Sequence, residues 1–411
     1  MRHMTGSAKK VLVVCGADPR TDPRPHRMIN WLKSQYLTTA VGFVRGAEDI
    51  QMDGVHCVTI IREKAATSAR RLQARRTAVT RMGRMALRAF QQGRRIPHVA
   101  LGHTKALLEL DARIYPQLAH HLTTNEYDLI VNHDLRLLPL VINLRKRAKI
   151  LFDAREYYPR NFEDRLWWRL VFQPENHLLC NTYLSQCDQV ITVSAGLANE
   201  YDRVYGVLPA VIMSWPPFVP LSPRPTREGR VRVIHHGRAN PSRRIESMIE
   251  TMDHVDERFT LDLMLVPATP SSYLKKLHSL ARERKNVKIV PPVAMKELVA
   301  ATNEYDIGLF LCKPTNFNLA HALPNKLFEF IQARLAVAIG PSIEMQRIVR
   351  EYDCGVVSDS FEPRSLAHAL NRLTADKITY YKQQSHRAAS ELTAEENAQK
   401  AGAIVRDLIG E

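Results

Sequence analysis

The chain of 411 residues lacks the marks of several protein classes. Its six cysteines are scattered, with no CxxC pair and no His/Cys cluster at zinc spacing, which predicts reduced thiols and no metal site. No apolar run approaches the roughly 18 residues of a membrane span, and the N-terminal "MRHMTGSAKK" lacks the apolar core of a signal peptide. We therefore expect a cytoplasmic protein. The first strand leads into "VVCGADPR", which has no GxGxxG turn, so a dinucleotide oxidoreductase is disfavoured.

Acidic residues are scarce as well. Lysine and arginine number 58 against 42 acids, and the net charge of +16 favours an anionic partner. In the segment 62–95 the only acid is Glu63, one helical face is apolar, and arginines fill the rest. This pattern fits either a solvated helix on the first domain or a helix that contacts an anionic inner-leaflet surface or an anionic acceptor. Phe90 is the only aromatic side chain among these arginines, so we expect no nucleic-acid partner.

Alternating apolar strands and helical patterns predict an α/β fold with two domains. In the first half, runs such as "KKVLVVCGADPR", "YDLIVNHD" and "CDQVITVS" each end in polar residues. The stretch 216–229 is rich in proline, which fits neither a helix nor a strand, so we predict that it is the linker between two domains. The predicted domains are thus 1–215 and 230–390, each with a doubly wound parallel sheet, and a C-terminal helix at 391–411 that can cross back to the first domain. We expect the carboxyl ends of both sheets, where such sheets bind ligands, to face one cleft.

The stretch "HALPNKLFEF" (321–330) predicts a helix start suited to ligand binding. Pro324 suits the first helical turn, and Asn325 and Glu329, four residues apart, share a face. The free amides of the helix start suit a phosphate or a sugar hydroxyl, and a carboxylate one turn deeper can accept two hydrogen bonds from a ribose diol. The alternative is a surface glutamate on an ordinary helix.

The stretch "HHGRANPSRRIE" predicts a phosphate-binding loop. A strand that ends at Gly237 is followed by Arg238, Arg243 and Arg244 on the way to the next helix. Without a metal, the negative charge on a departing nucleotide is met by fixed cations and helix amides. The alternative is a solvated basic loop.

Four stretches together carry a resemblance to a known family. "ALPNKLFEF" with "ARLAVAIGPSIEM" resembles the "PNKLFEY" stretch of retaining, metal-independent GT-B glycosyltransferases of family 4, the glycosyl transferases group 1 set. "HHGRANPSRRIE" resembles the phosphate loop of that family, "CDQVITVS" its late strand of the first domain, and "DAREYYP" its "D-A-H-E-x-Y-P" stretch. The likeness spans nearly the whole chain in the expected order. It implies a GT-B fold, with two Rossmann-like domains that bind acceptor and nucleotide-sugar donor respectively.

The resemblance also implies which residues bind the donor. Glu329 would bind the ribose, and Arg238 with Arg243 or Arg244 would hold the diphosphate. The donor-binding positions that we expect are Gly237, Arg238, Arg243, Arg244, His321, Leu323, Asn325, Lys326 and Glu329.

Two positions depart from the family pattern. His321 stands where the family often has an acid, and Arg155 stands where "DAHE" would place a histidine. Arginine cannot act as a base near neutral pH, so either catalysis relies on charge or a residue of "VNHD", His133 or Asp134, has the role. A structural histidine at that strand end is the alternative.

The loop "VVCGADPRTDPRPHR" would meet the acceptor, through Asp18, Arg20, Asp22 or Arg24. We therefore predict a glycosyltransferase that moves a sugar from a nucleotide-sugar donor to a glycan or lipid-linked acceptor, as in cell-surface polysaccharide assembly, with retention and with no cofactor or metal. It would be cytoplasmic and peripheral on the inner membrane face. The alternative is a basic α/β protein that binds nucleic acid or another polyanion and has no transferase activity.

Overall fold

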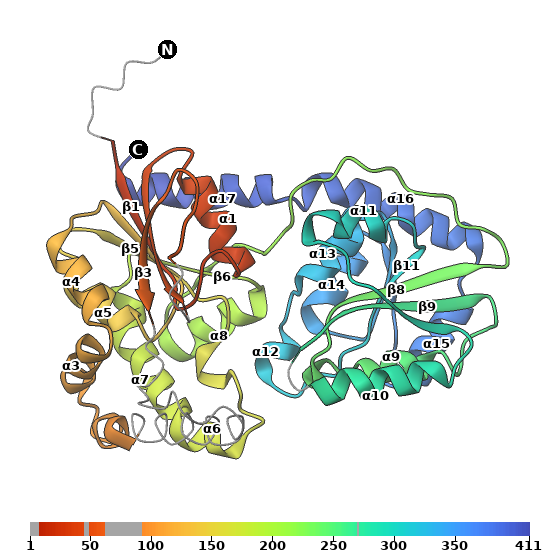
Figure 1. Ribbon diagram of the computed structural model, residues 1–411, viewed down its shortest axis with the longest axis horizontal. Helices are drawn as coiled ribbons and strands as arrows, with labels where there is room; N and C mark the ends of the chain where they lie inside the picture. Colours follow the sequence, from red (N-terminus) through yellow and green to blue (C-terminus); the bar gives the residue numbers. More distant parts are fainter. Residues whose placement is uncertain (1–7, 45–48, 62–92, 269–270) are drawn as a thin grey trace, which may run out of the picture. The chain divides into compact units, whose positions relative to one another are not determined.

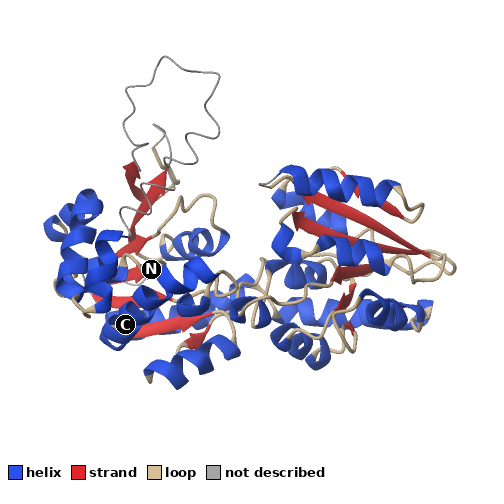
Figure 2. Cartoon of the chain, turned by 90° about the horizontal axis from the view of Figure 1, so that it is seen from below, coloured by secondary structure: helices blue, strands red, loops and turns tan. Residues whose placement is uncertain are grey.

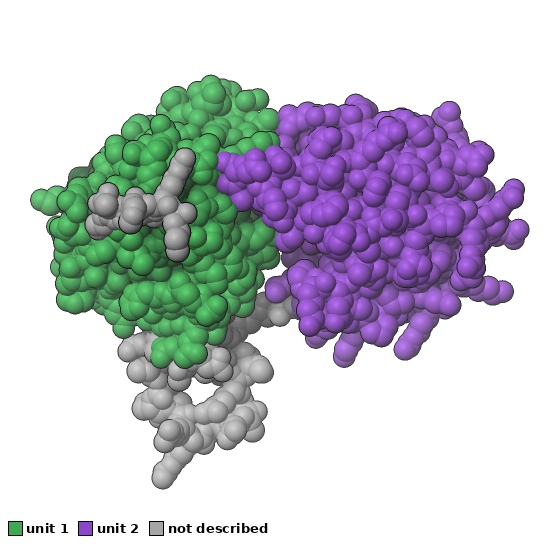
Figure 3. Space-filling view, turned by 90° about the horizontal axis from the view of Figure 1, so that it is seen from above, with its two compact units in different colours: residues 1–212, 400–411 green, residues 213–399 purple. Residues whose placement is uncertain are grey.

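The computed structural model describes residues 8–44, 49–61, 93–268 and 271–411. The chain divides into two compact units, residues 1–212 with 400–411 and residues 213–399 (Figure 3). No helix in these described ranges is long and apolar enough to cross a membrane.

Unit 1 is built on a parallel sheet of seven strands in the order β3-β2-β1-β4-β5-β6-β7 (Figure 1). The strands are β1 (Lys10–Val14), β2 (Leu37–Val44), β3 (His56–Ile61), β4 (Leu129–Asn132), β5 (Lys149–Asp153), β6 (Gln189–Thr192) and β7 (Ala210–Val211). The helices are α1 (Pro23–Leu32), α3 (Thr104–Ile114), α4 (Pro116–Thr124), α5 (Leu138–Leu144), α6 (Leu166–Val171), α7 (Gln173–Tyr183) and α8 (Ala195–Tyr205), with 3-10 turns η1 (Tyr158–Arg160) and η2 (Leu184–Gln186).

Unit 2 repeats this architecture with six parallel strands in the order β10-β9-β8-β11-β12-β13. The strands are β8 (Val231–Arg238), β9 (Phe259–Val266), β10 (Val287–Val290), β11 (Ile307–Phe310), β12 (Ala336–Ile339) and β13 (Gly355–Val357). The helices are α9 (Ile245–Thr251), α10 (Ser271–Arg282), α11 (Leu298–Thr302), α12 (Phe317–Ala320), α13 (Asn325–Gln332), α14 (Ile343–Glu351), α15 (Pro363–Asn371) and α16 (Ala375–Glu391), with 3-10 turns η3 (Pro241–Arg243) and η4 (Met295–Glu297).

Helices cover both faces of each sheet, because side chains that alternate along buried strands present an apolar surface on either side (Figure 2). In unit 2, one core lies under α9, α10 and α15, and a second lies under α13 and α14. The prediction of two doubly wound Rossmann-like domains is confirmed. In each sheet the strand order reverses beside the first strand, between β1 and β4 and between β8 and β11. Ligands of such sheets bind at the carboxyl ends of the strands at this point.

The last helix, α17 (Ala394–Ile409), begins in unit 2 and ends in unit 1. Val405 and Ile409 pack in the core of unit 1 with Ile29 of α1. A Cβ atom on Gly402 would lie 2.7 Å from the Trp31 ring, so the absence of a side chain there lets α17 approach α1 closely.

The proline-rich stretch that we predicted as a linker lies within unit 2 and is bound to it. Arg334 is fully buried, and its guanidinium donates to the carbonyl oxygens of Val219 at 2.7 Å and Leu221 at 3.1 Å. The amide oxygen of Gln332 accepts from the N–H of Val219. These bonds satisfy main-chain groups that no sheet or helix pairs.

The arginine-rich segment 62–95 lies outside the described residues from 62 to 92. Arg95 is described, and it corrects the expectation for that residue. Its side chain is buried and pairs with Asp111 of α3 at 2.6 Å and with Glu175 of α7 at 2.7 Å. A guanidinium removed from water needs such partners, so Arg95 holds helices of unit 1 together and is not available to an anionic partner.

Candidate active site

In unit 2, β8 ends in a conformation that favours glycine. Gly237 has a φ of +129°, which L side chains rarely adopt, and a Cβ atom on it would lie 3.3 Å from Nζ of Lys326. The glycine thus brings the main chain at the end of β8 close to the first turn of α13. Pro324 is the N-cap of this helix, so it precedes the first turn that we predicted for it.

Four cationic side chains occupy this end of the sheet: Arg238, Arg243, Arg244 and Lys326. Arg238 and Arg244 are exposed, and Arg243 and Lys326 are partly buried. Within the described ranges, none of the four forms an ion pair with a carboxylate. Glu329 is close enough to raise the pKa of Lys326, but four cations against one nearby acid still create a positive potential, which an anion with several oxygens would neutralise.

Lys326 has an unusual environment for a lysine. Part of its side chain touches solvent, but Nζ is densely surrounded by protein, 4.5 Å from the centre of the Phe310 ring and 3.4 Å from Nε2 of His235. This burial, reinforced by the charge of Arg243, lowers the pKa of Lys326 to about 7. Nδ1 of His235 lies 2.9 Å from the carbonyl oxygen of Leu309 and donates to it, which leaves Nε2 as an acceptor for the Lys326 ammonium.

Glu329 lies one turn further along α13. Its side chain is 16% exposed, and Oε2 lies 3.7 Å from Nε2 of His236. Burial, with the charge of Lys326, lowers the pKa of His236 to about 3, so this imidazole is neutral and forms no ion pair with Glu329 near pH 7. Asn325, at the start of the helix, is partly buried, and Leu323 is buried in the apolar core beneath it.

His321 contacts an acid that sequence analysis missed. Nδ1 of His321 lies 3.3 Å from Oε1 of Glu344, whose side chain is 3% exposed and whose other oxygen lies 3.4 Å from Nη2 of Arg347. The His321 ring also packs on Phe317, with 4.4 Å between ring centres. Glu344 can accept a hydrogen bond from Nδ1 of His321, and Nε2 is the other ring nitrogen. Glu344 follows β12 in the first turn of α14, and this position at a strand end was the one available signal.

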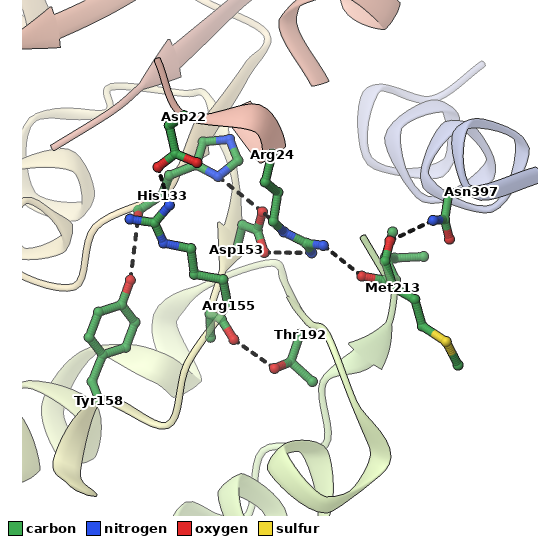
Figure 4. Close-up of polar contacts among 11 residues, drawn as sticks. Asp22, Arg24, His133, Asp153, Arg155, Tyr158, Thr192, Met213 and Asn397 are labelled. Carbon is green, nitrogen blue, oxygen red and sulfur yellow. Dashed lines mark hydrogen bonds and ion pairs between the residues drawn. The ribbon is translucent and has the colours of Figure 1, made fainter. Parts of the chain in front are cut away.

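In unit 1, the predicted residues Arg24 and His133 meet on a carboxylate that sequence analysis did not select (Figure 4). Asp153 ends β5 and is fully buried. Arg24 donates to it through Nε at 2.6 Å and Nη2 at 2.8 Å, and Nδ1 of His133 lies 3.0 Å from Oδ2. Burial opposes ionisation of Asp153, but Arg24 and then His133 outweigh it and hold the pKa of this carboxyl well below its usual range. Its place at a buried strand end, as the first residue of "DAREYYP", could have identified it.

Arg155 pairs with Asp22, the N-cap residue of α1 (Figure 4). Burial would lower the pKa of the Arg155 guanidinium, but Tyr158 and Asp22 outweigh this and raise it, so the group stays charged. The Tyr158 hydroxyl donates to the carbonyl oxygen of His133 at 3.2 Å. The structure therefore brings five predicted or neighbouring side chains of unit 1 together: Asp22, Arg24, His133, Asp153 and Arg155.

The remaining predicted residues of unit 1 follow β1 and β4. Asp134 follows β4, and Asp18 and Arg20, in the loop after β1, pair with each other. A Cβ atom on Gly16 would lie 1.8 Å from Oδ2 of Asp134, so only glycine lets the loop after β1 pass this carboxylate. The main-chain N–H of Arg136 donates to the other oxygen of Asp134 at 2.9 Å. Asp18 and Arg20 form an exposed pair at 2.8 Å, apart from the Asp153 contacts. The catalytic and acceptor roles of all these residues stay predictions.

No group of three or more His, Cys, Asp or Glu side chains in the described part of the chain could hold a metal ion. Unit 2 offers cations to an anionic ligand, and unit 1 offers a paired guanidinium, carboxylates and an imidazole.

Comparisons with known proteins agree on the kind of protein. The profile of the family described as Glycosyltransferase Family 4 matches residues 10–223, more than half of the chain. No curated protein matches the sequence of this chain significantly. Among solved structures, Anabaena HepE in complex with UDP has a TM-score of 0.66 at 13% identity, over 97% of this chain and 100% of that one.

Two further structures show the same fold. A UDP-forming α,α-trehalose-phosphate synthase from Burkholderia vietnamiensis has a TM-score of 0.63 at 13% identity, over 97% of this chain and 100% of that one. TarM of S. aureus, a mutant in complex with Fondaparinux, α-GlcNAc-glycerol and UDP, has a TM-score of 0.54 at 12% identity, over 71% of this chain and 58% of that one. At these identities the likeness shows the GT-B fold alone.

Proposed function

This chain belongs to Glycosyltransferase Family 4, and we propose from this that it moves a sugar from a nucleotide-sugar donor to a glycan or lipid-linked acceptor. The transfer would retain the configuration at the anomeric carbon and would need no metal ion. Structural neighbours crystallised with UDP support a nucleotide donor.

The observation that carries this proposal is the group of cations without acidic partners at the end of β8 and the start of α13. A nucleoside diphosphate would bring two or three negative charges to Arg238, Arg243, Arg244 and Lys326, none of which forms an ion pair with a described carboxylate. As the bond from the sugar to the diphosphate breaks, charge grows on the leaving oxygens, and these cations would stabilise it without a metal.

Glu329 would accept hydrogen bonds from the ribose diol of the same donor. Its neighbour His236 is neutral and lies 3.7 Å from Oε2, so it forms no ion pair with the carboxylate near pH 7. His321, whose Nδ1 faces Glu344, would meet a hydroxyl of the donor sugar through Nε2.

For the acceptor we propose the residues of unit 1. The acceptor hydroxyl would attack the anomeric carbon from the face that the diphosphate leaves, and its proton would pass to an oxygen of that diphosphate. Arg155 would contribute positive charge and not proton transfer, since its guanidinium stays protonated. His133 and Asp134 are the alternative acceptors of that proton, and Asp18, Arg20, Asp22 and Arg24 are the candidates for contacts with the acceptor.

The place of action is also proposed. A basic protein that extends a cell-surface glycan would work at the inner membrane face, and the arginine-rich segment 62–95, apart from Arg95, would supply the electrostatic contact. Binding to anionic vesicles that disappears at high salt, and that is lost after Arg70, Arg71, Arg75, Arg76, Arg81 and Arg84 are replaced by glutamine, would support this. A simultaneous loss of turnover on a soluble acceptor would assign the segment to the acceptor site instead.

A thermal-shift screen with UDP, GDP, ADP and their sugars tests the donor proposal first. A ligand that binds only the folded state raises the melting temperature, and an enzyme should respond to one base in a saturable manner. Equal responses to all polyanions would instead indicate a binding protein without transferase activity.

Glu329→Gln then tests the ribose contact. Hydrogen bonds to a charged group contribute roughly 1.5 to 3 kcal/mol, so calorimetric affinity for the nucleoside diphosphate should fall by about one to two orders of magnitude. The loss should shrink for the 2′,3′-dideoxy nucleotide, which has no diol. The matched control is Glu297→Gln, an exposed glutamate of the same unit that should leave both affinities unchanged. An equal loss for both ligands in Glu329→Gln would disprove the contact.

A further inference from the structure

The helix α6 exposes a cluster of large apolar side chains. Leu166, Trp167 and Leu170 are 62%, 63% and 66% exposed, and Phe162, just before the helix, is 42% exposed. We call these four residues the α6 patch. Other exposed apolar side chains, such as Leu208 and Met295, are far from it in sequence. Single exposed apolar residues need no explanation, whereas a contiguous set marks an interaction site.

The opposite side of α6 is anchored. Val171 is buried, Trp168 is partly buried, and the helix packs on α7. Phe172 directly follows α6 and is also the N-cap residue of α7, so the two helices are joined without a loop. The exposed residues are therefore held outward by a fixed element, at the margin of unit 1 where Figure 1 shows α6 beyond α7.

Cations run along the apolar row. Arg165 and Arg169 are four residues apart, so they lie one above the other on the helix, beside the row formed by Leu166 and Leu170. Both are exposed, and α6 itself contains no acid, while the exposed Asp164 directly precedes Arg165. The nearby Glu163 is paired with Arg160 at 2.5 Å, so part of its charge is offset. Arginine beside Trp and Leu on one outward surface is typical of a helix that lies in a membrane interface.

We propose that the α6 patch inserts into the interfacial region of an anionic membrane. The four side chains protrude, so they suit a soft, deformable layer, and Arg165 and Arg169 would reach the lipid phosphates as the apolar side chains enter. The net charge of +16 favours the same surface. This contact is hydrophobic and adds to the electrostatic one proposed for the arginine-rich segment. It rests on the proposal that the enzyme works at a membrane.

Trp167 provides an internal probe. The chain has four tryptophans, of which Trp215 is 5% exposed and only Trp167 belongs to the large exposed apolar residues. With vesicles of phosphatidylglycerol and phosphatidylcholine whose acyl chains are brominated, tryptophan fluorescence of the full chain should be quenched. The conservative Trp167→Phe variant should bind the vesicles and lose most of this quenching. Unchanged quenching in Trp167→Phe would overturn the insertion of α6.

The energetic test replaces exposed leucines, which leaves the core intact. Leu166→Ser with Leu170→Ser should lower the vesicle partition coefficient at high salt at least tenfold, equivalent to about 1.4 kcal/mol. Leu208→Ser with Met295→Ser, two equally exposed apolar residues elsewhere, should leave it unchanged. Wild-type partitioning by the α6 variant would refute this inference, while salt-sensitive vesicle binding would still support the arginine-rich segment. Self-association that the α6 variant abolishes, without vesicle binding, would assign the patch to a second copy and also refute it.

Discussion

Raising the pH from 7.5 to 8.5 should weaken the binding of a nucleoside diphosphate through the deprotonation of Lys326. In the free protein, burial first and then Arg243 hold the pKa of this ammonium at about 7. A bound diphosphate would bring negative charge to it and return the pKa toward the ordinary 10.5 of a lysine. Binding then requires uptake of a proton whenever the free side chain is neutral.

The size of the effect follows from these two values. The protonated fraction of free Lys326 falls from about one quarter at pH 7.5 to about 3% at pH 8.5, while the bound side chain stays protonated. The dissociation constant should therefore rise about eightfold, or ~1.2 kcal/mol. Below pH 7 the dependence on Lys326 should level off, because the free side chain is then already charged.

Calorimetry in buffers of different ionisation enthalpy measures both the dissociation constant and the number of protons taken up on binding. At pH 7.5 roughly three quarters of a proton should be taken up for each nucleoside diphosphate bound. Lys326→Arg, which stays charged, should remove this uptake and the dependence on pH. The reasoning is refuted if wild-type affinity is flat between pH 7.5 and 8.5, or if Lys326→Arg keeps the full slope.

The same pKa links pH to folding in the absence of ligand. Between about pH 7 and 10.5 the unfolded chain binds more protons at position 326 than the folded chain does. Lys326 should therefore destabilise the folded state at low pH and lose this effect as the pH rises through that window. Urea unfolding of wild type and Lys326→Met should show a difference that narrows at alkaline pH.

Three substitutions test other parts of the site. Asp153→Asn leaves the Arg24 charge without its buried carboxylate and should lower the free energy of unfolding at pH 7 by about 3 kcal/mol. In urea titrations this deficit should shrink below about pH 4, because the unfolded wild-type chain then takes up a proton at Asp153 while the folded chain keeps this carboxylate ionised. His321→Glu should change donor-sugar preference more than nucleotide affinity, and unchanged preference across a panel of sugars would exclude His321 from the sugar site. The new carboxylate would lie beside Glu344 and lower the stability of the fold. Combining it with Glu344→Gln, which removes the adjacent carboxylate, should restore that stability. Arg155→His should shift the pH optimum of turnover toward the imidazole range if this side chain acts at the reacting sugar, and an unshifted profile would exclude a direct role.

Sequence analysis predicted the fold and identified the strand ends at which polar residues lie. It selected the cationic residues of unit 2, including Arg243 and Lys326, because they follow a strand or begin a helix. It missed Glu344 and Asp153, whose partners are distant in sequence. It also assigned Arg95 to a solvated or anion-binding helix, whereas two acids of other helices enclose it.

The sequence by itself determined the alternation of strands and helices and the order of the two domains, because the period of apolar residues and the positions of proline and glycine act over a few residues along the chain. Only the tertiary structure decided which charges meet. Arg24 reaches Asp153 across 129 positions, and Lys326 lies beside His235 across 91. Burial, which sets the pKa of Lys326 and the ionisation of Asp153, depends on how the helices pack on the sheets, and no local pattern encodes the solvent that this packing excludes.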